Sequence, residues 1–167
     1  DRTGNYVPWD YSYNILQSCE PGAILFTNGD NDTYPLWYLQ FVEGIRTDVR
    51  IVNLSLLNTM WYIRQLRDGE PKISVELTDR DLEGMAPIHW PEKRYVKLSF
   101  QPDVILRYMS EQPEIARKAA ETGSMTFEIS PTLAGKAIRP QDFMIFHIIQ
   151  SNGWRKPIYF AITIPEV

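Results

Sequence analysis

Two carboxylates one residue apart, Asp30 and Asp32, are the side chains of this chain best placed for chemistry. They follow a short apolar run, 23–26, within the polar cluster 27–33. Carboxylate oxygens at the end of a buried strand are ligands for Mg²⁺, Mn²⁺ or Ca²⁺, and a metal so held commonly grips a diphosphate. One hypothesis is therefore a metal-dependent enzyme domain that acts on a phosphate-bearing substrate through this pair.

The same loop also has a structural interpretation. Asn28, Gly29 and Asp30 form a typical turn sequence, and Asp32 or Thr33 suits the N-cap of a following helix. An isolated Asp-x-Asp pair is a weak signal. The divalent metal is therefore the alternative hypothesis, and no other cofactor is indicated.

A second polar group, Asn53, Ser55 and Asn58, follows another apolar run, 49–54. If the two runs are neighbouring strands, these side chains face the same crevice as the first loop. Amides and carboxylates beside tryptophan suit a sugar, because polar groups bind hydroxyls while the aromatic ring contacts the C–H face. The predicted binding set is Asn28, Asp30, Asp32, Trp37, Asn53, Ser55 and Asn58. Alternatively, the amides satisfy loop backbone and the aromatics belong to the core.

Other catalytic patterns do not occur in the sequence. His147 lies in an apolar helical run, which favours a neutral, hydrogen-bonded imidazole over a base or a metal ligand. Cys19 has no activating partner nearby in sequence and is interpreted as an inert thiol. The sequence contains no Gly-rich phosphate loop and no Gly-x-Ser-x-Gly elbow. We therefore assign no catalytic residue.

The elements around the two polar groups predict a Rossmann-like βαβ core with a mostly parallel sheet. A short amphipathic helix over 9–16 precedes a strand over 23–27. A helix from Asp32 or Thr33 to Gly44, a strand over 49–54 and a helix over about 59–68 follow. Near the end, a helix begins at Pro140 with Asp142 in its first turn, and the apolar run 157–164 predicts a central strand.

The middle of the chain has a different pattern. Apolar residues alternate with polar ones around 73–77, 96–100 and 125–129, which predicts half-exposed, more often antiparallel strands. Residues 102–122 have a helical pattern broken near Pro113. We interpret about 70–135 as a β-rich, partly antiparallel insertion in a single α/β domain, 1–167.

The 167 residues, 44% hydrophobic and 23% charged, are sufficient for one globular domain. A net charge of −4 without a basic patch excludes nucleic acid as an expected partner. No apolar run is long enough for a membrane span. Because the sequence begins at Asp1 without a methionine, we interpret it as a fragment of a longer protein.

Both ends of the chain resemble a known family. The similar segments are 1–6, 9–11, 23–33, 48–59, 61–63, 139–142 and 154–161, and include the motif Thr27-Asn28-Gly29-Asp30-Asn31-Asp32-Thr33. The family is a large group of bacterial multi-spanning membrane proteins of unknown function. It is allied to the protein O-mannosyltransferases and resembles glycosyltransferases that use lipid-phosphosugars. The middle, about 70–135, is only loosely similar.

The resemblance implies a bacterial parent whose membrane region, absent from this sequence, carries the catalysis. This domain would follow the last span on the extracytoplasmic (periplasmic) side. Its partners would be its own membrane-spanning region and a glycan or acceptor protein. Three hypotheses follow: an accessory domain that binds acceptor or glycan or braces the membrane part, the metal-dependent enzyme above, and a purely structural module.

Overall fold

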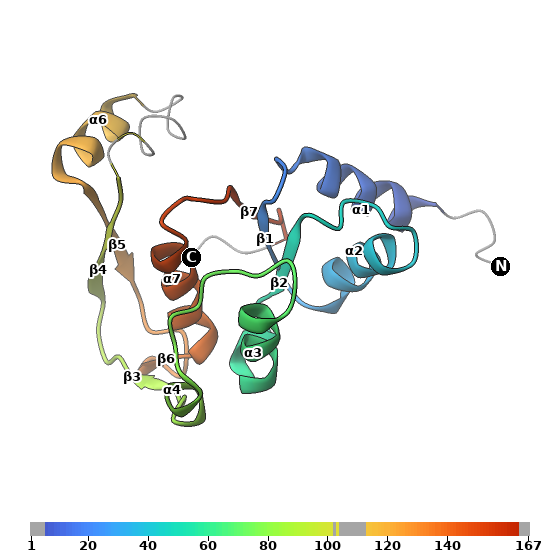
Figure 1. Cartoon of the computed structure of the whole chain (residues 1–167). Helices are drawn as coiled ribbons and strands as arrows, with labels where there is room; N and C mark the ends of the chain where they lie inside the picture. The colour runs from blue at the N-terminus through green and yellow to red at the C-terminus, as the bar shows by residue number, and fades with distance from the viewer. Residues whose placement is uncertain (1–5, 102, 104–112, 164–167) are drawn as a thin grey trace. The chain divides into compact units, whose positions relative to one another are not determined.

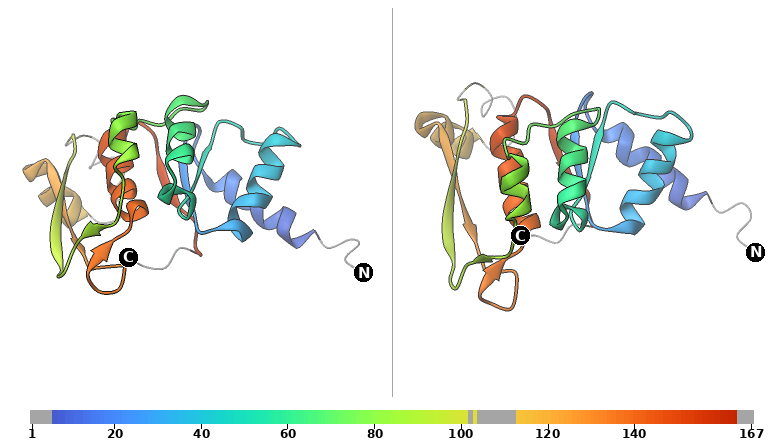
Figure 2. Two further views of the ribbon diagram at one scale, coloured as in Figure 1. Left: turned by 90° about the horizontal axis from the view of Figure 1, so that it is seen from below. Right: turned by 60° about the horizontal axis from the view of Figure 1, so that its bottom comes forward.

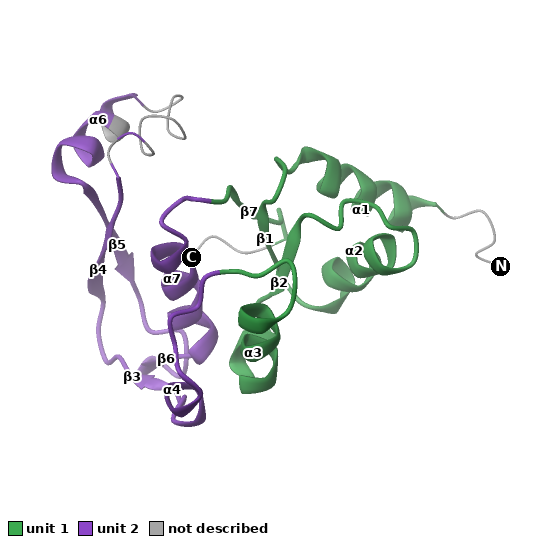
Figure 3. Cartoon of the chain, viewed as in Figure 1, with its two compact units in different colours: residues 1–73, 156–167 green, residues 74–155 purple. Residues whose placement is uncertain are grey.

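The computed structural model describes residues 6–101, 103 and 113–163, which form two compact units. Unit 1 contains 1–73 and 156–167, and unit 2 contains 74–155, as Figure 3 shows in green and purple. Unit 2 thus covers a longer stretch than the insertion predicted over 70–135. The description as one domain stays a prediction.

Unit 1 is built on a parallel sheet of three strands in the order β2-β1-β7. Its strands are β1 (Ile24–Thr27), β2 (Arg50–Asn53) and β7 (Ile158–Phe160). β1 pairs with both neighbours, and its last residue, Thr27, is level with Asn53 of β2. The fully buried apolar run of β1 explains its central position, because such a strand needs cover on both faces. The predicted parallel βαβ unit is confirmed.

Helices α1 (Val7–Ser18) and α2 (Asp30–Phe41) lie on one face of this sheet, while α3 (Met60–Asp68) lies on the other (Figures 1 and 2). Between the sheet and the first two helices is an apolar core that includes Leu16, Leu25, Leu36, Leu39 and Ile51. A short 3-10 turn, η1 (Leu56–Asn58), connects β2 to α3. The helices predicted over 9–16 and 59–68 are therefore confirmed.

Helix α2 begins at Asp30, two or three residues before the predicted start at Asp32 or Thr33. Its N-cap is Gly29, whose φ of 81° a residue with a side chain rarely adopts. The N-cap role predicted for Asp32 or Thr33 is therefore wrong. Asp32 occupies the third helical position instead, and its Oδ2 accepts the backbone N–H of Asn28 at 3.2 Å. This contact resembles the return arm of a capping box.

Unit 2 combines a two-stranded antiparallel ribbon, β4 (Arg94–Ser99) and β5 (Ser124–Ile129), with α7 (Pro140–Asn152). Leu98, Phe127 and Phe146 are part of the apolar cluster that joins ribbon and helix. The remaining elements are α4 (Asp79–Glu83), α6 (Pro113–Thr122) and the antiparallel pair β3 (Ile88–His89) and β6 (Ala137–Ile138). The predicted antiparallel strands over 96–100 and 125–129 are confirmed, as is the helix from Pro140.

Two strand predictions are wrong, and one helix is only partly described. Residues 73–77 form no strand, although Ile73 and Val75 are buried, because an extended segment can alternate in burial without a ladder partner. The strand predicted as central over 157–164 is the short β7 at one end of the three-strand order. In the helix predicted over 102–122, residues 102 and 104–112 lie outside the described residues.

Within the described residues, no helix has the length and apolar character needed to cross a bilayer.

Candidate functional site

The polar groups predicted to share a crevice lie at the carboxyl ends of β1 and β2. Parallel pairing with Thr27 level with Asn53 brings both following loops to the same edge of the sheet. Most of these side chains, however, are occupied with contacts within the protein.

Asn53 is fully buried and its groups bind other parts of unit 1. Its Nδ2 donates to Thr33 Oγ1 at 2.9 Å, and its Oδ1 accepts the backbone N–H of Leu56 at 3.0 Å. Its own backbone N–H donates to the hydroxyl of Tyr62 at 2.9 Å. Asn53 thus joins β2 to both helices that flank the sheet. For this residue, the interpretation that the amide satisfies loop backbone is confirmed.

Thr33 is the centre of this buried network. Its hydroxyl donates to the carbonyl oxygen of Gly29 at 2.5 Å, so its two lone pairs are left to accept. One accepts from Asn53, and the other accepts from the hydroxyl of Thr27 at an oxygen–oxygen distance of 2.7 Å. Thr27 and Thr33 are both fully buried. The network therefore satisfies its own hydrogen bonds without a ligand.

The two carboxylates of the Asp-x-Asp pair have different partners. Asp32 is 6% exposed and, besides the N–H of Asn28, accepts the hydroxyl of Thr163. The Asn28 amide donates to the carbonyl of Thr163 at 3.2 Å, which ties the end of β1 to the segment after β7. Asp30 is exposed, and its charge and hydrogen bond raise the pKa of Tyr34.

Metal binding by this pair stays a prediction. In the part of the chain that the structure describes, no group of three or more His, Cys, Asp or Glu side chains gathers that could hold a metal ion.

Ser55 and Asn58 are exposed in the loop after β2, where the Asn58 amide donates to the Ser55 carbonyl at 3.1 Å. Whether these residues bind a ligand also stays a prediction.

Trp37, the one aromatic residue in the predicted set, lines a pocket of about 310 Å³ at the β2 edge of the sheet. Phe41 on α2 and Trp61 on α3 also line it, and their exposed fractions are 78% and 57%. The polar lining includes Arg50 and Glu70, which sequence reasoning missed. A volume near the lower end of the ~300–1,000 Å³ typical of small-molecule sites fits a ligand of monosaccharide size.

Arg50 connects β2 to the segment after α3 in the wall of this pocket. Its guanidinium donates to the carbonyl oxygens of Gln65 at 2.7 Å and Glu70 at 3.0 Å. Its Nε is buried without a hydrogen-bond partner among the described residues. Burial lowers the pKa of the guanidinium, but an arginine stays charged at neutral pH. The pocket wall therefore contains a cation hydrogen-bonded to neutral carbonyls.

The outer edge of β2 is covered by side chains. The Tyr62 hydroxyl accepts the N–H of Asn53 and donates to the carbonyl of Ile51 at 3.3 Å. On the other side, Gln40 Nε2 donates to the carbonyl of Val49 at 2.7 Å. These contacts take the place of a neighbouring strand, so the edge is not open to a peptide that pairs along β2.

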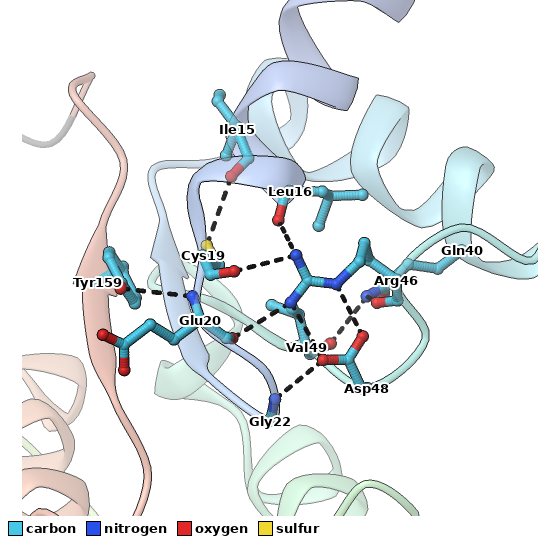
Figure 4. Close-up of polar contacts among 10 residues, drawn as sticks. All are labelled: Ile15, Leu16, Cys19, Glu20, Gly22, Gln40, Arg46, Asp48, Val49 and Tyr159. Carbon is cyan, nitrogen blue, oxygen red and sulfur yellow. Dashed lines mark hydrogen bonds and ion pairs between the residues drawn. The ribbon is translucent and has the colours of Figure 1, made fainter.

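A second polar cluster holds α1 against the β2 side of unit 1, and sequence reasoning missed it (Figure 4). The Arg46 guanidinium donates to the carbonyl oxygens of Leu16 at 2.6 Å, Cys19 at 3.0 Å and Glu20 at 3.2 Å. It also forms a two-pronged pair with Asp48 at 2.9 and 3.1 Å. Arg46 thus caps the carbonyl end of α1, where a cation is favourable.

Asp48 completes this cluster. It accepts the backbone N–H of Gly22 at 2.9 Å, and the hydrogen bond from Arg46 is the main cause that lowers its pKa to about 2. Cys19 nearby is 5% exposed, and burial raises the pKa of its thiol. These properties agree with the expected inert thiol. The cluster is structural, because Arg46 and Asp48 bind groups of unit 1 itself.

His147 in unit 2 also has a structural role. Its Nε2 accepts the backbone N–H of Glu76 at 3.1 Å, which requires that nitrogen to be unprotonated. Burial lowers the pKa of the imidazole. The expected neutral, hydrogen-bonded histidine agrees with this geometry.

Comparison with known proteins gives the family. The model of the family described as TMEM260-associated domain 2 matches residues 8–97, more than half of the chain, and the chain therefore belongs to this family. A curated relative from Mus musculus, Protein O-mannosyl-transferase TMEM260, is 31% identical over 72 residues. That match covers 43% of this chain and only 10% of the relative's length. No solved structure matches the chain.

Proposed function

We propose that this member of the TMEM260-associated domain 2 family is an accessory domain of a membrane glycosyltransferase of the protein O-mannosyltransferase type. It recognises the acceptor protein or its glycan, while the catalysis lies in the membrane-spanning part of the parent. The observation that carries this proposal is the 31% identity to a protein named as an O-mannosyl-transferase. The family match, 8–97, covers the first two strands and first three helices of unit 1.

The geometry of unit 1 supports recognition over catalysis. The polar side chains at the carboxyl ends of the strands, led by Thr33 and Asn53, hydrogen-bond one another in the interior. The aromatic pocket at the β2 edge, by contrast, is open to solvent at Phe41 and Trp61. Recognition of a substrate requires such an accessible surface, whereas the buried network stabilises the fold.

The proposal includes the setting of the parent. We propose a bacterial membrane protein with several spans, on which this domain lies at the extracytoplasmic side and contacts its own membrane-spanning region. Bracing that region is the second task open to the same domain. Resemblance to the family of bacterial multi-spanning proteins supports this setting, and similarity to the mouse O-mannosyl-transferase supports the type of parent enzyme.

The test is mannosyl transfer by the full-length parent in membranes, with an acceptor peptide and a lipid-phosphate-linked mannose donor. Phe41→Ala removes a 78% exposed ring from the pocket rim. Tyr38→Ala is the matched control, because Tyr38 is a half-exposed aromatic residue of the same helix that does not line the pocket. We expect Phe41→Ala to lower kcat/KM for transfer at least ~5-fold, which corresponds to a loss of about 1 kcal/mol of binding free energy. For Tyr38→Ala we expect less than a twofold change. Equal activity of both variants and wild type would contradict a recognition role.

A further inference from the structure

The pocket at the β2 edge combines features that together define the kind of ligand it binds. Trp37 and Phe41 approach from α2, on one face of the sheet, and Trp61 approaches from α3 on the other. Val49, just before β2, and Ile51 of β2 also line the pocket, and both are nearly fully buried. Aromatic rings from two helices thus border a cavity of about 310 Å³.

Trp61 is held in place for a stacking contact. Its ring meets the Tyr62 ring edge-to-face, with centroids 5.6 Å apart and an interplanar angle of 71°. Tyr62 is itself 2% exposed and is fixed through its hydroxyl to β2. The indole of Trp61 is thus 57% exposed and packs on a buried ring that is hydrogen-bonded to β2. Its electron-rich face attracts the partially positive C–H groups of a ligand.

The polar wall favours an uncharged ligand. Arg50 supplies a cation and Glu70 a carboxylate, and both residues line the same pocket. A phosphate or carboxylate that approached Arg50 would also meet the charge of Glu70. A neutral molecule rich in hydroxyl groups uses both, since each hydroxyl donates one hydrogen bond and accepts others. The Gln65 side chain, exposed at the same wall, adds a further donor and acceptor.

A peptide strand is not the occupant that this geometry favours. The Tyr62 hydroxyl and the Gln40 amide already bind the outer backbone groups of Val49, Ile51 and Asn53. Pairing of a peptide with β2 would have to break these buried contacts. The remaining capacity of the pocket lies in its aromatic rings and in its mixed polar wall.

We propose that this pocket is a subsite for a neutral hexopyranose, with the sugar ring stacked on Trp61 and its hydroxyls bonded at the Arg50–Glu70 wall. The inference rests on the proposed function and specifies it: the ligand is a mannosyl residue already attached to the acceptor. Binding of such a residue keeps a partly mannosylated protein near the transferase. The domain then acts on the product of one transfer to favour the next.

The first experiment is a titration of the chain with methyl α-D-mannopyranoside, followed by tryptophan fluorescence and by saturation-transfer NMR. A ligand of this size at ordinary ligand efficiency gives a Kd of about 1 mM. We expect Trp61→Ala to raise the Kd at least ~10-fold, Trp61→Phe to recover part of the affinity, and Tyr38→Ala to leave it unchanged. Melting curves of the same variants show whether each remains folded. No saturation transfer at tens of millimolar mannoside, or equal affinity of wild type and a folded Trp61→Ala, would overturn the subsite.

A second arm tests the charge argument and separates the two proposals. Mannose 6-phosphate is expected to bind more weakly than the methyl mannoside, and tighter binding would show an anion site in place of a neutral one. If the mannoside binds through Trp61 while Phe41→Ala and Trp61→Ala leave transfer by the full-length parent intact, the subsite stands and the accessory function falls. If transfer is lost without mannoside binding, the accessory function stands and the sugar subsite falls.

Discussion

Replacement of Arg46 by alanine is expected to be among the most destabilising single changes in unit 1. The side chain is 18% exposed and makes five hydrogen bonds, three to carbonyl oxygens at the end of α1 and two to Asp48. Hydrogen bonds to a charged group contribute about 1.5–3 kcal/mol each. They are not additive within one network, however, and the pair with the 42% exposed Asp48 contributes less than about 1 kcal/mol.

The expected loss is therefore about 2–4 kcal/mol, mostly from the carbonyls of Leu16 and Cys19. Both lose the guanidinium, and the Leu16 carbonyl keeps only the backbone N–H of Cys19 at 3.3 Å. Backbone strain does not contribute to the difference. Arg46 has a φ of 48°, and alanine carries the same Cβ into that conformation. The measured loss therefore reflects the side chain beyond Cβ, that is, the guanidinium and its aliphatic stem.

Urea unfolding at pH 7, followed by circular dichroism and tryptophan fluorescence, measures this loss. Arg46→Lys is the matched variant, because it keeps the positive charge but not the planar fork that reaches several acceptors at once. We expect its free energy of unfolding to fall between those of wild type and Arg46→Ala. A loss below about 0.5 kcal/mol for Arg46→Ala would refute the view that this side chain fixes the end of α1.

Four further predictions concern the clusters described above. The carboxyl of Asp48 has its pKa lowered from 3.8 to about 2, so its contribution is full above pH 3.8 and is lost as the pH falls through about 2. In urea unfolding, Asp48→Asn is therefore expected to cost about 1 kcal/mol at pH 7, after screening at a 42% exposed group, and progressively less as the pH falls toward and below about 2. Asn53→Ala is expected to lower the free energy of unfolding by about 2–4 kcal/mol, because it leaves buried partners unsatisfied. Asn58→Ala, at an exposed amide, is the control and is expected to change that free energy by less than ~0.5 kcal/mol. Equal effects of the two substitutions would contradict the network. Burial lowers the pKa of His147 below the unfolded value of 6.5, so wild-type stability falls as the pH drops below 6.5. His147→Gln is expected to remove this part of the pH dependence. The same pH dependence in the variant would disprove the role of His147. The metal hypothesis predicts that millimolar Mg²⁺, Mn²⁺ or Ca²⁺ raises the Tm and that Asp30→Asn abolishes the rise, whereas the accessory-domain proposal predicts the same Tm with and without these ions.

Local sequence signals were sufficient for the βαβ core. The apolar run before Thr27 indicated a buried strand, and the polar cluster after it indicated a turn into a helix, as the structure shows. The mixed α/β class and the antiparallel ribbon followed from periodicity in the same way. Errors arose where strand pairing was inferred from the pattern of apolar residues alone. Ile73 and Val75 alternate in burial without a strand partner, and β7 has an apolar sequence although it lies at an end of the sheet.

The candidate sites were harder to predict because their partners are distant in sequence. Arg46 meets Leu16 across 30 residues, and Arg50 meets Glu70 across 20. No residue spacing reveals such contacts before the chain is folded. The position of an asparagine in the sequence also does not show whether its side-chain amide faces solvent. Asn53 was placed correctly at the end of β2, but its burial depends on Thr33 and Tyr62, which come from two different helices.

The carboxyl ends of the strands and the outer edge of β2 differ in how their polar groups are used. At the carboxyl ends, Thr33 and Asn53 use their polar groups to join strands to helices, and ligand binding there would have to compete with buried hydrogen bonds. At the β2 edge, Trp61 and Phe41 remain exposed beside a backbone to which Tyr62 and Gln40 are already hydrogen-bonded. A ligand at this edge gains stacking and hydrogen bonds without disrupting the fold. This difference in cost is the physical reason to place recognition at the aromatic pocket rather than at the loop 28–33.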